Sequence, residues 1–238
     1  MNITIIIPTL NEEQSLPTTL AEIAKRYTQA TQPQIIVADC QSKDNTLQIA
    51  KDAGATTISI SPDKACRAEA MNIGAKAASG DILLFLDADT LPPKGFDSII
   101  SKALATPAMV GGAFELRLVP RTFAIRVVEA CNRVRYRMRQ CYFGDQAIFV
   151  KKEAFNQVGG YPITYLMESA RLCLKLKRIG KICLLRPPVL SSGRRFVEGG
   201  ILKVFLKDML ICMYEFFNIP LTRFEKKYRQ YNLTNHTS

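Results

Sequence analysis

Apolar runs of strand length alternate with amphipathic stretches of helix length through the first half of the chain. The predicted strands are Ile3–Ile7, Gln34–Ala38, Thr56–Ser61 and Asp81–Leu86, and the predicted helices cover residues 12–27, 44–53 and 66–78. Gly54 and Gly80 follow two of these helices, at positions where glycine commonly ends a helix. Strands separated by helices are typical of a parallel sheet with right-handed crossovers, so this half predicts an α/β fold.

The second half begins with strand patterns and then becomes helical. Gly111–Leu118 and Gln146–Val150 are predicted strands, and the Pro187–Pro188 and Gly199–Gly200 pairs predict turns. Residues 121–140 carry apolar side chains at helical spacing, namely Phe123, Val127, Ala130, Val134 and Met138. No linker or repeat interrupts the pattern, so we expect one continuous domain with halves 1–118 and 119–238.

Residues 201–217 form the most apolar helical stretch. Lys203, Lys207 and Asp208 interrupt it, which argues against a membrane-spanning helix. Phe205, Met209 and Phe216 could lie in a membrane interface, or the helix could pack on the sheet. Packing is the favoured interpretation.

The segment Leu83–Thr90 is the most informative part of the chain. Leu83–Leu86 is apolar without alternation, as in a strand buried on both faces, and Asp87 and Asp89 follow at its end. Ligands bind beyond the carboxyl ends of strands in open α/β sheets, and alternate residues of an extended chain point to one side. The two carboxylates are therefore expected to share a hard divalent cation, Mg²⁺ or Mn²⁺. A solvated acidic turn is the structural alternative.

Composition excludes several kinds of site. The single histidine is His236, so histidine acid–base chemistry and histidine-rich metal sites are excluded. Seven scattered cysteines without a Cys-x-x-Cys pair indicate reduced thiols rather than a disulfide framework or a zinc site. Met1 leads directly into a strand, with no visible signal peptide, so we expect a cytoplasmic protein.

Charge is distributed unevenly along the chain. Residues 1–114 hold 9 Lys/Arg against 12 Asp/Glu, whereas residues 115–238 hold 23 against 9, a net charge of +14. This asymmetry predicts that the second half meets phosphates, nucleic acid or an acidic membrane surface. A basic face that only serves solubility is the alternative.

Polar residues follow each of the first strands. They are the loop Pro8–Glu12, Asp39 with Ser42–Asp44, and Arg67, Asn72 and Gly74. Asn11 and Asp44 could each be only helix N-caps. Their joint order, ending in Asp87 and Asp89, nevertheless indicates a nucleotide site at one edge of the sheet.

Four segments together carry a family resemblance. IIIPTLNEE (5–13), VADCQSKDNT (37–46), AMNIGAKAASGDILLFLDADT (70–90) and YFGDQAIFVKKEAFNQVGGY (142–161), with the later Glu168, resemble family 2 glycosyltransferases of the GT-A fold. Phe143–Ala147 and Ser192–Phe196 resemble signatures of a small bacterial subgroup. The resemblance implies a mixed, mostly parallel sheet flanked by helices, with a basic C-terminal helical region forming the acceptor side.

The resemblance also implies a nucleotide-sugar donor, a UDP- or GDP-sugar, bound by residues 1–118. Pro8, Thr9 and Glu12 would line the nucleoside pocket, and Asp39 would accept a hydrogen bond from the base. Arg67 would reach the diphosphate. Asp89, helped by Asp87, would hold Mg²⁺ or Mn²⁺, which neutralises charge on the leaving diphosphate.

The chain departs from the family pattern at the catalytic base. The family places an aspartate where this chain has Ser169, and a hydroxyl cannot replace a carboxylate as a general base near neutral pH. Glu168 is the first candidate for this role and Asp145 the second; absence of a competent base is the third possibility. Glu168 could also be only a carboxylate favoured at a helix start. Cys66 and Glu69 stand where the subgroup often has Gly and Arg, which would remove one diphosphate-binding cation.

These inferences favour an inverting glycosyltransferase acting on an unknown, lipid-linked or membrane-proximal hydroxyl acceptor, peripheral to the inner face of the cell membrane. A catalytically silent nucleotide-sugar-binding protein is the main rival. A nucleic-acid-binding protein is less favoured, because the seven arginines between 117 and 139 lack interleaved aromatic residues. A nucleotidyltransferase is also less favoured, because Pro8–Glu12 contains no glycine.

Overall fold

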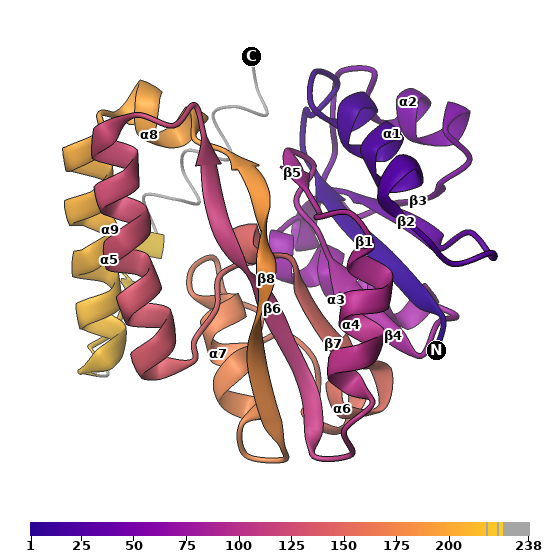
Figure 1. The fold of residues 1–238 in the computed structure, drawn as a ribbon. Helices are drawn as coiled ribbons and strands as arrows, with labels where there is room; N and C mark the ends of the chain where they lie inside the picture. The colour runs from indigo at the N-terminus through magenta and orange to yellow at the C-terminus, as the bar shows by residue number, and fades with distance from the viewer. Residues whose placement is uncertain (218, 223, 226–238) are drawn as a thin grey trace.

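One eight-stranded mixed sheet runs through the protein, with helices on both faces (Figure 1). The computed structural model describes residues 1–217, 219–222 and 224–225; His236 lies outside them. The strand order is β3-β2-β1-β4-β7-β6-β8-β5, and four of its seven pairings are parallel. The sheet takes strands from both sides of residue 118.

The first four strands are parallel neighbours. They are β1 (Ile3–Thr9), β2 (Gln34–Asp39), β3 (Thr56–Ser59) and β4 (Ile82–Phe85), connected through α1 (Leu16–Arg26), α2 (Thr46–Asp52), the short η1 (Pro62–Lys64) and α3 (Arg67–Ala77). This alternation confirms the α/β prediction for the first half. Every residue of β4 is buried, as its unbroken apolar run predicts.

The other half of the sheet is built around a long parallel pair. β6 (Met109–Val119) pairs with β8 (Lys181–Ser192), β7 (Ile148–Lys151) joins β6 to β4, and β5 (Thr90–Leu91) pairs with the end of β8. The prediction of a turn at Pro187–Pro188 was wrong, because both residues lie inside β8. The register shifts between Phe114 and Leu116, and this bulge accommodates prolines that cannot donate to a regular ladder.

Two buried clusters cover opposite faces of the sheet. The first core cluster contains Phe114, Leu116 and Phe149 and packs under α1 and α4 (Phe96–Leu104), a helix that the sequence pattern did not predict. The second core cluster contains Phe85 and Tyr136 and packs under α3, α6 (Lys152–Gln157) and α7 (Glu168–Leu176). α3 and α7 therefore lie on the same face of the sheet.

Three helices stand together beyond the β6–β8 end of the sheet. α5 (Phe123–Arg139) and α9 (Ile201–Phe216) lie side by side, and α8 (Arg194–Gly199) connects β8 to them (Figure 1). α9 therefore packs on α5 and α8, and its first turns also contact the first core cluster. Gly200, with φ of 79°, makes the predicted turn between α8 and α9.

This helical group leaves large apolar side chains in solvent. Phe123, Val127 and Val134 of α5 are exposed, so these members of the predicted stripe face outward, while Ile125 and Val128 enter the core. The side chain of Met138 lies outside the described part of the structure. Phe205 is half-buried against the first core cluster. Among the helices that the structure describes, none combines the length and apolarity needed to cross a membrane.

Candidate active site

The loops after β1 and β2 are joined by hydrogen bonds. Thr9 Oγ1 donates to Asp39 Oδ1 at 2.9 Å, and Ser42 N donates to Asp39 Oδ2 at 2.8 Å. Asp39 is fully buried, and in this arrangement it holds the two loops together. Pro8 precedes Thr9 on β1 and lies opposite Ala38 of β2.

Asn11 also links the loops after β1 and β2, and it does not cap a helix. It has φ of 53°, its Oδ1 accepts from Lys43 N at 2.8 Å, and α1 begins only at Leu16. The chain turns at Asn11 toward the 42–43 loop, so the predicted helix starts four residues later than expected. Asp44 is not the N-cap either, because Asn45 takes that position in α2. Asp44 precedes it, and its Oδ1 accepts from Thr46 N at 3.0 Å.

Arg67 connects three elements at the reacting edge. It stands at the first position of α3; one guanidinium nitrogen pairs with Asp87 after β4, and Nη1 lies 2.6 Å from Glu168 Oε1 at the start of α7. These residues are 20 and 101 positions from Arg67 in sequence. The structure thus brings the proposed diphosphate cation, one proposed metal carboxylate and the first candidate base into one ion-pair network.

Gly144 and Asp145 belong to η2 (Gly144–Gln146), which lies next to this network. A Cβ at Gly144 would overlap the Arg67 guanidinium, so the glycine permits this close approach. Asp145 Oδ1 is buried without a hydrogen-bond partner. Burial, together with the charge of Asp87, raises the pKa of the Asp145 carboxyl to about 6.

Asp89 lies close to Glu12 and to Arg194 at the start of α8. Burial and the neighbouring charge of Asp87 raise the pKa of Asp89, and Arg194 partly offsets this. Burial and Asp89 likewise raise the pKa of Glu12, whose Oε1 lies 3.8 Å from Arg194 Nη2 and whose Oε2 is buried without a partner. Like charges gathered in this way favour a cation among them.

The donor set fits a hard cation only in part. Asp87 and Asp89 offer carboxylate oxygens, the ligand type that Mg²⁺ and Mn²⁺ prefer. Within the described residues, however, no group of three or more His, Cys, Asp or Glu side chains is arranged to hold a metal. A cation here would need further oxygen ligands from a bound diphosphate.

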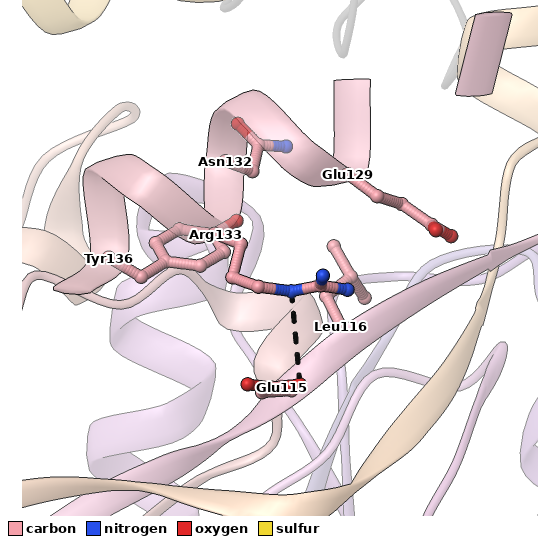
Figure 2. Close-up of a pocket in the computed structure, with 6 residues that line it drawn as sticks. All are labelled: Glu115, Leu116, Glu129, Asn132, Arg133 and Tyr136. Carbon is pink, nitrogen blue, oxygen red and sulfur yellow. Dashed lines mark ion pairs between the residues drawn. The ribbon is translucent and has the colours of Figure 1, made fainter. Parts of the chain in front are cut away.

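A small pocket beside the active edge was not predicted. It has a cavity volume of about 10 Å³ and lies between β6 and α5. Figure 2 shows Arg133 reaching from α5 toward Glu115 of β6, with Tyr136 on one side of Arg133 and Glu129 on the other. Tyr136, one of its lining residues, is buried. Burial and then the charge of Asp145 raise the pKa of its phenol.

Sequence reasoning also missed the positions of Gly144 and Arg194. Both lie in segments that the sequence singled out, Phe143–Ala147 and Ser192–Phe196. The motif signal was present, but the contact of Gly144 with Arg67 and that of Arg194 with Glu12 join residues far apart along the chain. No local pattern predicts those contacts.

Comparison with known proteins identifies the family of the chain. The sequence profile of Glycosyl transferase family 2 matches residues 4–160. A 4,4'-diaponeurosporenoate glycosyltransferase of Staphylococcus haemolyticus (strain JCSC1435) is 34% identical over 93 residues, which is 37% of this chain. The chain spans about a quarter of that relative, 24% of its length.

Solved structures share the fold. S. aureus TarS 1–349 superposes with a TM-score of 0.65 at 16% identity, covering 82% of this chain and 61% of that one. Mannosyltransferase PcManGT from Pyrobaculum calidifontis superposes with a TM-score of 0.65 at 21% identity, covering 80% of this chain and 56% of that one. These neighbours confirm the expected GT-A fold. Together with the profile match over residues 4–160, they establish that the chain belongs to glycosyltransferase family 2.

Proposed function

We propose that this protein transfers a sugar from a nucleoside-diphosphate sugar to a hydroxyl acceptor, with inversion at the anomeric carbon. The observation that carries this proposal is the bridge from Arg67 to Asp87 and Glu168. Direct displacement requires a cationic group for the diphosphate, a carboxylate for the metal and a base for the acceptor hydroxyl in one site. These three groups already share one ion-pair network.

The side chains of the network have separate duties in this proposal. The Arg67 fork binds the donor diphosphate, since a guanidinium matches phosphate oxygens in pairs. As Arg67 turns to the diphosphate, Glu168 loses its partner and can accept the proton of the acceptor hydroxyl. Ser169 Oγ, 3.3 Å from Glu168 Oε1, orients that carboxylate and does not act as a base.

Arg194 supplies the second cation for the diphosphate, which α3 lacks because this chain has Glu69 where the subgroup often has Arg. It reaches the site from α8, its side chain is half exposed at 50%, and Glu12 is its acidic neighbour at 3.8 Å. A diphosphate bound near Asp89 would therefore lie between guanidinium groups of α3 and α8. Two such groups distribute the negative charge of the leaving diphosphate.

Asp89 and Asp87 would hold the divalent cation. When bound, this cation would stabilise the negative charge of the leaving nucleoside diphosphate. Related structures indicate the donor class: TarS 1–349 has been solved with UDP-GlcNAc, and PcManGT with GDP-Man and Mn²⁺. Glucosyl-3-phosphoglycerate synthase from Mycobacterium tuberculosis has been solved with Mn²⁺ and UDP. A UDP- or GDP-sugar is the donor that these neighbours support.

The acceptor side favours a membrane-proximal substrate. α9 exposes Leu202, Leu206, Met209, Met213 and Phe216 at helical spacing, with Lys203 and Lys207 also in solvent. An apolar stripe beside basic residues is typical of helices that lie in a membrane interface. We therefore propose that α9 holds the enzyme at an anionic membrane where a lipid-linked acceptor is found.

A transfer assay with Glu168→Gln tests the base. We expect turnover to fall by about 10²–10⁴-fold with donor affinity nearly unchanged, because only proton removal is lost. Donor transfer and donor hydrolysis would be measured with UDP- and GDP-sugars in Mn²⁺ and Mg²⁺. A comparable loss with Asp145→Asn, and none with Glu168→Gln, would move the role to Asp145.

The silent-binder alternative rests on Ser169, which is buried at 2% exposure in place of the family aspartate. It predicts donor binding by the wild type without turnover for any donor and acceptor pair. A gain of turnover in Ser169→Asp alone would establish it. Turnover by the wild type would exclude it.

A further inference from the structure

Three arginines converge on one carboxylate beside the small pocket of Figure 2. Glu115 of β6 lies 2.9 Å from Arg186 Nε, 3.6 Å from Arg137 Nη2 and 3.9 Å from Arg133 Nε. Glu115 is nearly buried, at 9% exposure, whereas the three arginine side chains are 43–64% exposed. We call these four residues the Glu115 cluster.

The bulge in β8 builds this cluster. Between the pairs Phe114–Leu185 and Leu116–Val189, three residues of β8 oppose Glu115 alone, and Arg186 is the first of them. Bulges commonly redirect a side chain next to a functional site. The extra residues therefore aim a guanidinium at a position that regular pairing would not give it.

One carboxylate leaves the cluster with an excess of two positive charges. The two oxygens of Glu115 are too few to accept from all the N–H donors of three guanidinium groups. Arg117, two residues beyond Glu115 on the same side of β6, adds a further exposed cation. A phosphate group, with several acceptor oxygens and more than one negative charge, matches this excess in both charge and geometry.

The cluster lies on the face of the sheet that carries α3 and α7. Phe114, Leu116 and Leu118 point into the first core cluster, so Glu115 points to the opposite face, where α7 and Tyr136 pack. Gln146 Nε2 donates to Phe114 O at 3.0 Å, which ties η2 and its Asp145 directly to the strand at Glu115. The cluster is thus beside the candidate base region and separate from Arg67 and Asp89.

We propose that the Glu115 cluster binds a phosphate group of the acceptor, with Glu115 holding the guanidinium groups together until that phosphate arrives. This inference rests on the proposed transferase function and adds the chemical class of its acceptor, a phosphorylated molecule. The donor diphosphate is bound elsewhere, at Arg67, so the two anions approach the reacting centre from different sides. The phosphate can belong to a lipid headgroup or to a soluble molecule.

The test uses inorganic pyrophosphate with the full chain in the presence of a metal chelator. Calorimetric titration of Arg133→Gln/Arg137→Gln should show affinity at least about tenfold weaker than wild type, as loss of charged hydrogen bonds requires. Arg126→Gln/Arg178→Gln is the control, since it removes the same charge at exposed positions outside the cluster. Glu115→Gln should bind pyrophosphate more tightly, because the competing carboxylate is gone. A folding defect would not produce that opposite change.

Binding of UDP with Mn²⁺, measured in parallel, separates this proposal from the proposed function. The Arg133→Gln/Arg137→Gln variant should keep wild-type UDP binding; if it keeps pyrophosphate binding as well, the cluster proposal is wrong. Weaker pyrophosphate binding by Glu115→Gln would also overturn it. Sedimentation with phosphatidylcholine vesicles, with and without phosphatidic acid, identifies the source. If the double variant loses the vesicle binding that depends on phosphatidic acid, the bound phosphate belongs to a lipid headgroup. If the double variant loses only pyrophosphate binding, the phosphate belongs to a soluble molecule.

Discussion

Arg67 holds two carboxylates from distant parts of the chain, and Gly144 leaves the space for it to do so. Each of these contacts depends on the position of a different element. α3 places the guanidinium, the end of β4 places Asp87, and the start of α7 places Glu168. At the scale of single residues, the site is therefore sensitive to small steric changes around one side chain.

Gly144→Ala tests that sensitivity. The added Cβ would overlap the Arg67 guanidinium, so the arginine must move away from Asp87 and Glu168. We expect weaker binding of UDP with Mn²⁺, and a melting temperature within a few degrees of wild type because only a flexible side chain end is displaced. Calorimetric titration and thermal unfolding measure the two effects. Wild-type UDP affinity in Gly144→Ala would show that the bridge is not needed for donor binding.

Asp145 gives a pH prediction of defined sign. Its pKa in the folded protein, about 6, lies above the ordinary value of 3.8, so the folded state holds the proton more tightly. The free energy of unfolding should therefore fall as pH rises between about 4 and 6. Asp145→Asn removes this penalty and should stabilise the protein at pH 7 by on the order of 2 to 3 kcal/mol.

Denaturant unfolding at pH 4 and pH 7 measures this difference. Asp97→Asn is the control of opposite sign, because buried Asp97 accepts hydrogen bonds from Thr28 and Gln29 and its loss should destabilise. Stabilisation by Asp145→Asn that is equal at both pH values would contradict the raised pKa.

At the scale of elements, strong local patterns predicted the sheet and its order in sequence. β4 was predictable because four apolar residues with a polar end permit few other structures. β8 was not, because Pro187–Pro188 is a local turn signal and only its long partner β6 overrides that signal. α4 was missed although Phe96, Ile100 and Leu104 are buried at helical spacing.

The candidate site shows the same limit. Asp87 and Asp89 could be placed from local sequence, since both follow one strand. The pairing of Arg67 with Glu168, and the convergence of three arginines on Glu115, depend on contacts between distant segments. A single sequence contains the residues of these contacts but not their neighbours in space.

α9 presents its apolar stripe and its lysines to solvent as one element. Its exposed stripe and two lysines should bind vesicles containing anionic lipid, with about 1 kcal/mol from each basic residue near the surface. Leu206→Glu/Met213→Glu should abolish the salt-resistant part of this binding, because apolar insertion is lost. Ile163→Glu, a change at another exposed apolar residue outside α9, is the control and should bind as wild type. Absence of wild-type binding to anionic vesicles at low salt would remove the membrane from the proposal.

Across the whole molecule, charge is distributed unevenly between the two halves of the sequence. The first half is slightly acidic, and the second half carries +14 over residues 115–238. The ion pairs around Glu115 and Glu129 neutralise only part of this charge. An anionic acceptor would be attracted toward the C-terminal half, and this attraction should weaken as salt screens it.

We propose that Asp89 and Asp87 form a metal-dependent diphosphate site in this family 2 glycosyltransferase. Thermal unfolding with UDP or GDP, with and without Mn²⁺, tests this site, because a ligand that binds only the native state raises the melting temperature. We predict stabilisation by one nucleotide that requires Mn²⁺ and is abolished in Asp89→Asn, with the melting temperature of the free variant close to wild type. Equal Mn²⁺-dependent stabilisation of wild type and Asp89→Asn, or no stabilisation of the wild type by either nucleotide, would contradict it.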